Sequence, residues 1–203
     1  MPFPVVGAVQ LAAHLEAGGV GLMPTDTLPA LVAKPEAAGQ IWTLKERPSE
    51  KPLILMGADL EALLPVLGHP WHEDWLTLAR CGWPGALTLV LPATGTIVEN
   101  LHPGGTSLGL RVPACPQALE LLQLSGPLAT TSANPSGVAS ATTAQEAAHW
   151  FPGLPLLAPL PWPVCGGIAS TVLAWNQSTN SLQGDGSWQL IRAGAFLLPR
   201  ECF

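Results

Sequence analysis

The sequence predicts a single α/β domain, in which helices cover the faces of a mixed, largely open and twisted β-sheet. Apolar stretches with helical spacing alternate with short apolar stretches of strand character, and no repeat, low-complexity segment or linker interrupts them. The units run from helix to strand and from strand to loop, which indicates mixed strand directions. A chain of 203 residues that is 48% hydrophobic is also long enough to bury one large core.

A helix, a strand and a polar turn come first. Residues 9–17 have helical spacing, and the glycine pair 18–19 that follows them is a C-terminal helix signal. Residues 20–23 then form a short apolar strand that ends at Pro24. The turn 25–27 places polar side chains just beyond that strand, where ligands bind in open sheets.

A second helix, a charged run and a second strand follow. The helix is expected over residues 36–44, because Pro35 stands near its first turn, where proline is favoured. The charged run covers residues 45–52, and the apolar residues 53–56 form the next strand.

The middle of the chain continues the alternation. Residues 71–81 and 117–124 are predicted helices. Residues 86–91 and 108–112 have strand character, and a proline follows each of them. Residues 128–130 form a further strand.

The last third begins with a polar loop, residues 131–137, and then a short helix. Thr143 and Glu146 stand three positions apart, which is the spacing of a capping box, and predict a helix through His149. Two final strands and the polar loop that joins them are expected over residues 170–175, 188–192 and 176–187.

The composition excludes several classes of protein. Mean hydropathy is +0.33, but no uninterrupted apolar stretch reaches the roughly 18 residues of a spanning helix, so no membrane segment is predicted. The N-terminus lacks the features of a secretory signal, and we therefore expect a cytoplasmic protein. A net charge of −6 gives no general attraction for nucleic acid.

The cysteines and histidines show no ligand pattern. The four cysteines lie tens of residues apart without a C-x-x-C, which predicts free thiols. The five histidines lack metal-ligand spacing, so the sequence assigns no metal-binding residue.

Cationic side chains concentrate in the charged run. Lys45, Arg47 and Lys51 are three of only eight Lys and Arg residues, and they stand within seven positions. Such a cluster can neutralise a polyphosphate. The alternative is a solvated helix end in which Glu46 and Glu50 pair with these cations.

Arg111 is the second sign of an anion site. It stands on an otherwise apolar strand, where a guanidinium needs an anionic partner or must extend its charged end to solvent. A bound carboxylate or phosphate would satisfy it. Three polar turns, residues 25–27, 130–134 and 170–171, each follow an apolar stretch and offer hydroxyls to a ligand or to their own backbone.

One motif suggests a serine hydrolase. Residues 105–109 match G-x-S-x-G around Ser107, with His149 and either Glu120 or Glu146 as partners, but a strand rather than a helix is predicted after the serine. Neither a P-loop nor a Rossmann fingerprint occurs.

Seven motifs carry a family resemblance. In order, they are Pro24-Thr25-Asp26-Thr27, Lys45-Glu46-Arg47-Pro48 with Lys51-Pro52-Leu53, Trp83-Pro84-Gly85-Ala86-Leu87-Thr88, Leu110-Arg111-Val112-Pro113, Thr130-Thr131-Ser132-Ala133-Asn134 with Ser136-Gly137, Ser170-Thr171-Val172 and Ile191-Arg192-Ala193-Gly194-Ala195. Together they resemble the YrdC-like family of threonylcarbamoyl-adenylate synthases, from about residue 18 to residue 195. The resemblance implies a concave ligand cavity in one YrdC-like domain over residues 1–203, the short form without the C-terminal domain of longer relatives.

The resemblance also implies a function. Members of the family make L-threonylcarbamoyl-AMP and pyrophosphate from L-threonine, bicarbonate and ATP with Mg²⁺, as the first step toward the t6A modification of tRNA. The short form would pass its product to downstream threonylcarbamoyl transferase proteins, so tRNA would be an indirect partner.

Site residues follow from the same resemblance. Lys45 and Arg47 are the implied catalytic residues, because they would neutralise the ATP phosphates. The implied ATP contacts are Lys45, Arg47, Lys51, Ser107, Ser132, Asn134 and Arg192. The implied threonine contacts are Thr25, Arg111, Thr130 and Ser170, with Arg111 meeting the carboxylate.

The chain departs from the family pattern at a few positions, and two other functions stay open. Residues 28–30 (Leu-Pro-Ala) replace the usual small residue and Tyr-Gly, and Met56 stands where many longer relatives have a histidine. An RNA-binding module and a nucleotide-binding paralogue without turnover are the main alternatives, and the serine hydrolase is a minor one.

Overall fold

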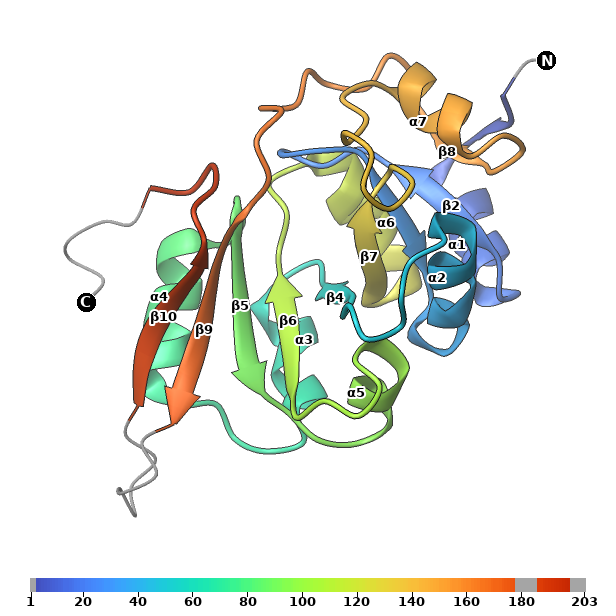
Figure 1. The fold of residues 1–203 in the computed structure, drawn as a ribbon. Helices are drawn as coiled ribbons and strands as arrows, with labels where there is room; N and C mark the ends of the chain where they lie inside the picture. Colours follow the sequence, from blue (N-terminus) through green and yellow to red (C-terminus); the bar gives the residue numbers. More distant parts are fainter. Residues whose placement is uncertain (1–2, 178–185, 198–203) are drawn as a thin grey trace.

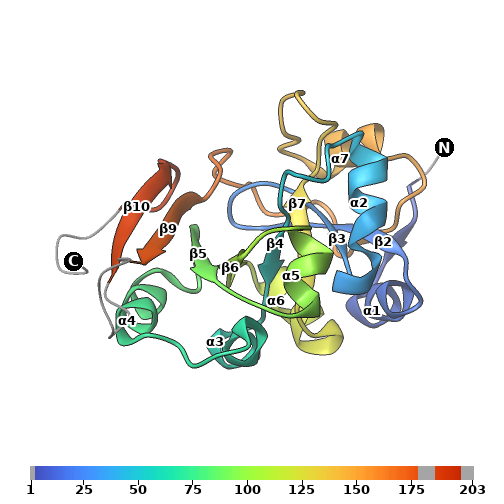
Figure 2. The ribbon, with the colours of Figure 1, turned by 60° about the horizontal axis from the view of Figure 1, so that its bottom comes forward.

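A computed structural model describes residues 3–177 and 186–197 of the chain. Its strands form one ten-stranded sheet in the order β1-β8-β2-β3-β7-β4-β6-β5-β9-β10. The sheet is twisted and open, with β10 at one end of the molecule and β2 toward the other (Figures 1 and 2). The sheet contains both parallel pairs, such as β4–β6, and antiparallel pairs, such as β5–β6, so the predicted mixed α/β fold is confirmed.

The strands are short. Their bounds are β1 Val5–Val6, β2 Val20–Met23, β3 Ala30–Ala33, β4 Ile54–Met56, β5 Leu87–Pro92, β6 Ser107–Arg111, β7 Leu128–Ser132, β8 Leu156–Leu157, β9 Thr171–Gln177 and β10 Gly186–Arg192.

Helices connect most of the strands. Their bounds are α1 Ala8–Glu16, α2 Ala38–Lys45, α3 Leu60–Leu63, α4 Glu73–Gly82, α5 Thr96–Leu101, α6 Pro116–Ser125 and α7 Ala144–Trp150, with 3₁₀ turns η1 Pro35–Ala37 and η2 Leu64–Leu67.

The two faces of the sheet carry different cores. On one face, Leu55, Leu89 and Leu110 pack in a large core that includes side chains of α2, α4, α5 and α7. On the other face, α1 and α6 form a smaller core with Met23 and Met56. Side chains alternate along a strand, so the residues on either side of a first-face core residue point to the second face.

The sequence missed one central strand, β3. All four of its residues are buried, because Leu31 and Ala33 enter one core while Ala30 and Val32 enter the other. A strand that is buried on both faces has no alternation between apolar and polar residues. The strands β1 and β8 and the helices α3 and α5 are also too short for a periodic signal.

The other predicted elements are confirmed with small changes at their ends. The expected helix over residues 36–44 begins as the 3₁₀ turn η1 before α2. The predicted loop 176–187 is shorter at both ends, because Asn176 pairs with Ser187 in the β9–β10 hairpin. The rest of that loop, residues 178–185, lies outside the described residues.

The cysteine prediction is partly wrong. Cys115 and Cys165 are free thiols, as expected. Cys81 is disulfide-bonded, however, and Cys202 lies outside the described residues. In the part of the chain that the structure describes, none of the helices combines the length and apolar character needed to cross a membrane.

The predicted cap of α7 leads to a stability test. The Thr143 hydroxyl accepts a hydrogen bond from the Glu146 amide at 3.1 Å, while the Glu146 carboxylate accepts from the Thr142 amide at 2.7 Å. We expect Thr143→Ala to lower the free energy of unfolding by about 1 kcal/mol in urea titrations, because it leaves a helix N–H without its acceptor. Thr143→Ser is the control and should stay near wild type. Equal stability of Thr143→Ala and wild type would contradict the cap.

Candidate functional site

A cavity of about 520 Å³ opens on the sheet face that carries α1 and α6. Ile54 and Met56 belong to its wall and also contact the core beneath these helices, so the cavity begins where that core ends. The lining residues are Thr25, Thr27, Leu28, Ala30, Arg47, Lys51, Pro52, Ile54, Met56, Thr88, Val90, Arg111, Thr130, Thr131, Ser132, Ser140, Ala169, Ser170, Val172, Ile191 and Arg192.

The cavity concentrates positive charge in an acidic protein. Arg47, Lys51, Arg111 and Arg192 are four of the eight Lys and Arg residues of the chain, and all four line it. None of the lining residues is Asp or Glu, although the chain has a net charge of −6. The cavity therefore has the electrostatics of an anion-binding site.

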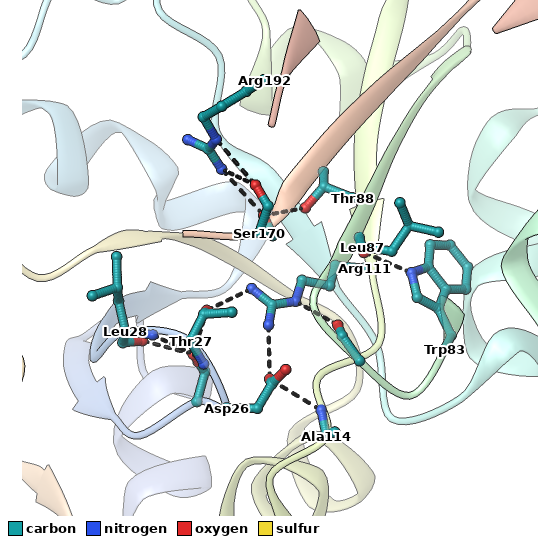
Figure 3. Close-up of polar contacts among 12 residues, drawn as sticks. Asp26, Thr27, Leu28, Trp83, Leu87, Thr88, Arg111, Ala114, Ser170 and Arg192 are labelled. Carbon is teal, nitrogen blue, oxygen red and sulfur yellow. Dashed lines mark hydrogen bonds and ion pairs between the residues drawn. The ribbon is translucent and has the colours of Figure 1, made fainter. Parts of the chain in front are cut away.

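Arg111 lies at the end of β6, where it is 2% exposed (Figure 3). Its Nε donates to the Gly85 carbonyl at 3.0 Å and its Nη1 to the Thr27 hydroxyl at 2.9 Å. Its Nη2 forms an ion pair with the Asp26 carboxylate at 2.7 Å. Burial lowers the pKa of Arg111, and the Asp26 charge opposes that change.

The anionic partner that the sequence required for Arg111 is thus Asp26. Sequence reasoning named Asp26 within a turn but did not assign it to the site. The carboxylate also accepts from the Ala114 amide at 3.1 Å, which fixes its position (Figure 3). Among the described residues, two of the five guanidinium N–H groups of Arg111 have no acceptor, and they remain available to a ligand.

The turn after β2 holds the hydroxyl that meets Arg111. Thr25 Oγ1 donates to the Leu28 carbonyl at 2.7 Å and accepts from the amides of Thr27 and Leu28, each at 3.1 Å. Since its one hydrogen is used, the 3.0 Å bond between the Thr25 and Thr27 hydroxyls is donated by Thr27. A lone pair of Thr27 then faces Arg111. Thr25 lines the cavity, but its hydroxyl is already engaged within the turn.

Arg192, at the end of β10, is fixed against Ser170. Its Nε and Nη2 donate to the Ser170 carbonyl at 3.0 and 2.9 Å, and Nη2 also lies 3.2 Å from the Ser170 hydroxyl. The Thr88 hydroxyl of β5 lies 2.8 Å from the same Ser170 hydroxyl (Figure 3). Sequence reasoning did not assign Thr88 to the site.

Lys45 lies behind the cavity wall and is 1% exposed. Its ammonium donates to the Ser132 carbonyl and, at 3.5 Å, to the Asn134 side chain. Burial is the main reason that its pKa falls to about 8, and the nearby Arg47 charge lowers it further. The Lys45 carbonyl accepts from the Ser136 amide at 3.0 Å. Lys45 therefore holds the loop after β7 through both its side chain and its backbone.

Asn134 organises that loop. Its side-chain oxygen accepts from the Ser132 hydroxyl at 2.6 Å and the Ser140 hydroxyl at 3.3 Å, and its amide donates to the Val138 carbonyl at 2.7 Å. This arrangement holds the Ser132 and Ser140 hydroxyls against Asn134 at the edge of the cavity that both residues line. Sequence reasoning did not assign Ser140, which no local pattern distinguishes.

The basic run places Arg47 and Lys51 at the cavity. Glu46, which ends α2, has φ 49°, and this left-handed residue redirects the chain. Arg47 Nε and Nη2 then donate to the carbonyls of Lys51 at 3.3 Å and Pro52 at 3.0 Å. In the described ion pairs, neither Glu46 nor Glu50 pairs with these cations, so the run is not the paired helix end of the alternative interpretation.

The structure brings together eight of the eleven residues named from the sequence. These are Thr25, Arg47, Lys51, Arg111, Thr130, Ser132, Ser170 and Arg192. Lys45 and Asn134 lie directly behind them. Ser107 does not line the cavity, because it begins β6 and stands four residues, about 13 Å, before Arg111 along the strand.

The serine-hydrolase hypothesis is not supported. Ser107 opens the strand β6, whereas a nucleophile elbow requires a strand before the serine and a helix after it. His102 lies nearby, but its ring bonds the Ser107 carbonyl at 2.9 Å rather than the hydroxyl.

Carboxylates, imidazoles and thiols do not gather into a metal site. No group of three or more His, Cys, Asp or Glu side chains occurs among residues 3–177 and 186–197. A divalent cation in this cavity would have to arrive bound to a ligand that supplies its own oxygen atoms.

Comparisons with known proteins agree with these features. A family model described as telomere recombination, Sua5/YciO/YrdC, matches residues 13–194. A threonylcarbamoyl-AMP synthase of Bacillus subtilis is 38% identical over 170 residues, which are 81% of this chain and 49% of that protein. The same-named protein of Stutzerimonas stutzeri is 36% identical over 146 residues, or 70% of this chain and 78% of that protein.

A solved structure is similar over nearly the whole chain. Sua5 of P. abyssi in complex with L-threonine has a TM-score of 0.80 and is 31% identical, and the match covers 92% of this chain and 54% of that one. The chain thus spans about half the length of the Bacillus subtilis and P. abyssi proteins.

The lowered pKa of Lys45 can be tested with an anion. We expect its ammonium to titrate near pH 8 in ¹³C-detected lysine spectra of the free protein. Pyrophosphate in the cavity should raise this pKa by roughly 1 to 3, because a nearby negative charge favours the protonated amine. Lys34, which is paired with Glu16 at 3.1 Å and does not line the cavity, is the internal control. An unchanged Lys45 pKa with bound pyrophosphate would mean that the amine only holds the loop.

Proposed function

We propose, because this chain belongs to the Sua5/YciO/YrdC family, that it is a nucleotidyltransferase that forms L-threonylcarbamoyl-AMP and pyrophosphate from L-threonine, bicarbonate and ATP. The observation that carries the proposal is the cavity itself, which four cations line without any carboxylate. Each substrate has an anionic group, namely the threonine carboxylate, bicarbonate and the ATP phosphates, and the product pyrophosphate concentrates several negative charges in one small group. An acid-free cationic cavity suits each of them.

The threonine end of the proposed site is built around Arg111. Two of its N–H groups remain free among the described residues, and a carboxylate can accept both in the bidentate geometry that guanidinium favours. Thr130 of β7 and Ser170, just before β9, both line the same cavity and carry hydroxyls. The threonine complex of the P. abyssi Sua5 supports this assignment by similarity.

The nucleotide end is assigned to the basic run and the loop after β7. Arg47 and Lys51 line the cavity from the basic run, and Arg192 lines it from β10. Ser132 and Ser140 add hydroxyls where the Asn134 loop meets the cavity. We assign Lys45 a supporting charge behind this wall. Ser107 is no longer favoured as a nucleotide contact, because it does not line the cavity.

In the proposed reaction, Mg²⁺ reaches the cavity bound to ATP. The cavity wall holds hydroxyls and cations but no carboxylate that would keep a divalent cation on the protein. When bound to ATP, the ion would neutralise part of the phosphate charge beside Arg47 and Lys51.

The reaction requires positioning rather than a covalent nucleophile. The neutral amino group of threonine attacks the bicarbonate carbon and forms a carbamate, with loss of one water molecule. A carbamate oxygen then attacks the α-phosphorus of ATP while the bond from that phosphorus to the oxygen bridging to the β-phosphate breaks, which releases pyrophosphate. Arg47, Lys51 and Arg192 would hold the leaving pyrophosphate and its developing charge. The apolar walls at Ile54 and Val90 would limit water, which hydrolyses both the carbamate and the mixed anhydride.

The wider context is proposed as well. We propose that residues 1–203 form a single domain of this family, that the protein works in the cytoplasm, and that other proteins transfer its product to tRNA. The single sheet that carries every lining strand supports the first of these. Similarity to proteins named threonylcarbamoyl-AMP synthases supports the last of these, because threonylcarbamoyl-AMP holds the threonylcarbamoyl group in an activated form that can be transferred.

The first test measures the reaction directly. Purified protein with ATP, Mg²⁺, bicarbonate and L-threonine should release pyrophosphate and form a compound with the mass of threonylcarbamoyl-AMP, and omission of threonine should abolish both. Arg47→Ala should lower kcat/KM for ATP by about 100-fold or more, since it removes a charge aimed at the transition state. Arg80→Ala is the matched control, because the exposed side chain of Arg80 pairs with Glu73 of α4 at 3.4 Å and does not line the cavity. No threonine-dependent product from folded wild type would refute the proposed function.

A second test separates the two ends of the cavity. Arg111→Ala should raise KM for threonine by about 10-fold or more and change KM for ATP far less, because it removes a bidentate carboxylate partner. Removing Arg111 also leaves Asp26 unpaired, so Arg111→Lys is the second variant, which keeps the charge but loses the planar fork. Equal effects on both KM values in a folded variant would remove Arg111 from the threonine end.

A further inference from the structure

We propose that Thr88 is a positioning residue that sets the direction of the Ser170 hydroxyl and thereby controls affinity for the amino-acid substrate, an inference that rests on the proposed function. Thr88 lies in the middle of the cavity wall on β5, between the Arg111 and Arg192 ends of the site (Figure 3). Its side chain is 1% exposed, and its hydroxyl lies 2.8 Å from that of Ser170.

The sheet fixes this hydroxyl pair. β5 and β9 are parallel, with Leu87 opposite Thr171 and Thr88 opposite Val172. The Thr171 amide donates to the Ala86 carbonyl at 2.9 Å, which anchors the start of β9 beside Thr88. Ser170 immediately precedes this anchored residue, so its backbone is held beside Thr88 and the direction of its hydroxyl depends on the side-chain contacts.

The hydrogen atoms of the pair show what Thr88 contributes. Two hydroxyls hold two hydrogens, and one of these lies in the bond between them. If Thr88 donates, Ser170 accepts from both Thr88 and Arg192, and its own hydrogen is left for a ligand. That arrangement suits a cavity in which cations and hydroxyls are plentiful and carboxylates are absent. A ligand oxygen is then the acceptor that the buried hydroxyl hydrogen requires.

Arg192 does not depend on Thr88 in the same way. Two of its three bonds go to the Ser170 backbone carbonyl, at 3.0 and 2.9 Å, and only the third goes to the hydroxyl. Loss of the Thr88 hydroxyl therefore frees the Ser170 side chain while the guanidinium stays in place. This difference predicts a selective effect on the amino-acid substrate rather than on ATP.

The test is Thr88→Val, which keeps the branched shape of the side chain and its strand propensity but removes the hydroxyl. We expect KM and the calorimetric Kd for L-threonine to rise about 10-fold, because a buried hydroxyl loses its partner, while KM for ATP changes by less than about 3-fold. Thr88→Ser should restore threonine affinity to near wild type. Thr88→Ala serves the same purpose if the valine variant fails to fold.

A double-mutant cycle shows whether Thr88 acts through Ser170. In the Ser170→Ala background, Thr88→Val should have little further effect on threonine affinity, because the hydroxyl it positions is absent. Thr43→Val is the matched control, since the Thr43 hydroxyl of α2 is exposed and donates to the Gly39 carbonyl at 3.1 Å. Threonine affinity and melting temperature of this control should match wild type.

The outcomes distinguish this inference from the proposed function. Unchanged threonine affinity in folded Thr88→Val, or an equal loss for threonine and ATP, would overturn the role of Thr88 while the synthase activity stands. Additive losses in the double mutant would also overturn it. If wild type binds threonine but forms no product, the proposed synthase activity is refuted. The role of Thr88 can still be tested, because threonine affinity can still be compared between wild type and Thr88→Val. Wild type that binds no threonine would overturn both.

Discussion

Arg111 places a positive charge on the sheet face that carries the cavity, at a position that is 2% exposed. Much of the site is built around that charge. The Asp26 carboxylate, the Thr27 hydroxyl and the Gly85 carbonyl surround the guanidinium from two segments that are far apart in the sequence. An unpaired guanidinium at this depth would be strongly destabilising. The turn after β2 and the segment before β5 are therefore held together by the same group that faces the ligand. Binding and folding share one interaction here.

The alternation of side chains along the strands explains how a small sheet holds both a core and a cavity. Leu55, Leu89 and Leu110 enter the core on one face, while their neighbours Ile54, Thr88 and Arg111 line the cavity on the other. The helices α1 and α6 cover only part of that second face, because their core ends at Met56. On the uncovered part of this face, polar side chains of the strands line the cavity and are not enclosed in an apolar core. A register shift of one residue would place Arg111 in the leucine core.

Sequence reasoning succeeded where periodicity or local chemistry carries the information. The helix α6 has leucines at helical spacing, and the basic run is recognisable from three cations in seven positions. It failed for β3, whose residues are divided between two cores and so show no polar face. It required an anion for Arg111 but did not find Asp26, which stands 85 positions earlier. Thr88 was missed for the same reason, since its partner Ser170 is 82 positions later. Pairs at such separations are set by strand order, which a single sequence does not reveal.

Close approach of two backbones explains why the motifs around Ser170 and Arg192 depend on each other. A Cβ atom on Gly194 would lie 2.3 Å from the Ala169 carbonyl oxygen and 2.5 Å from the Thr171 nitrogen, so only glycine permits this contact. The Thr171 hydroxyl then accepts from the amides of Gly194 at 3.1 Å and Phe196 at 3.2 Å and donates to the Phe196 carbonyl at 2.7 Å. These bonds clamp the segment after β10 onto the start of β9. Because Arg192 stands two residues before this clamp, its guanidinium reaches the Ser170 carbonyl without a carboxylate partner. Among the described contacts, the Arg192 guanidinium is thus oriented by the Ser170 carbonyl and hydroxyl and not by a carboxylate, so its charge stays available to an anionic ligand.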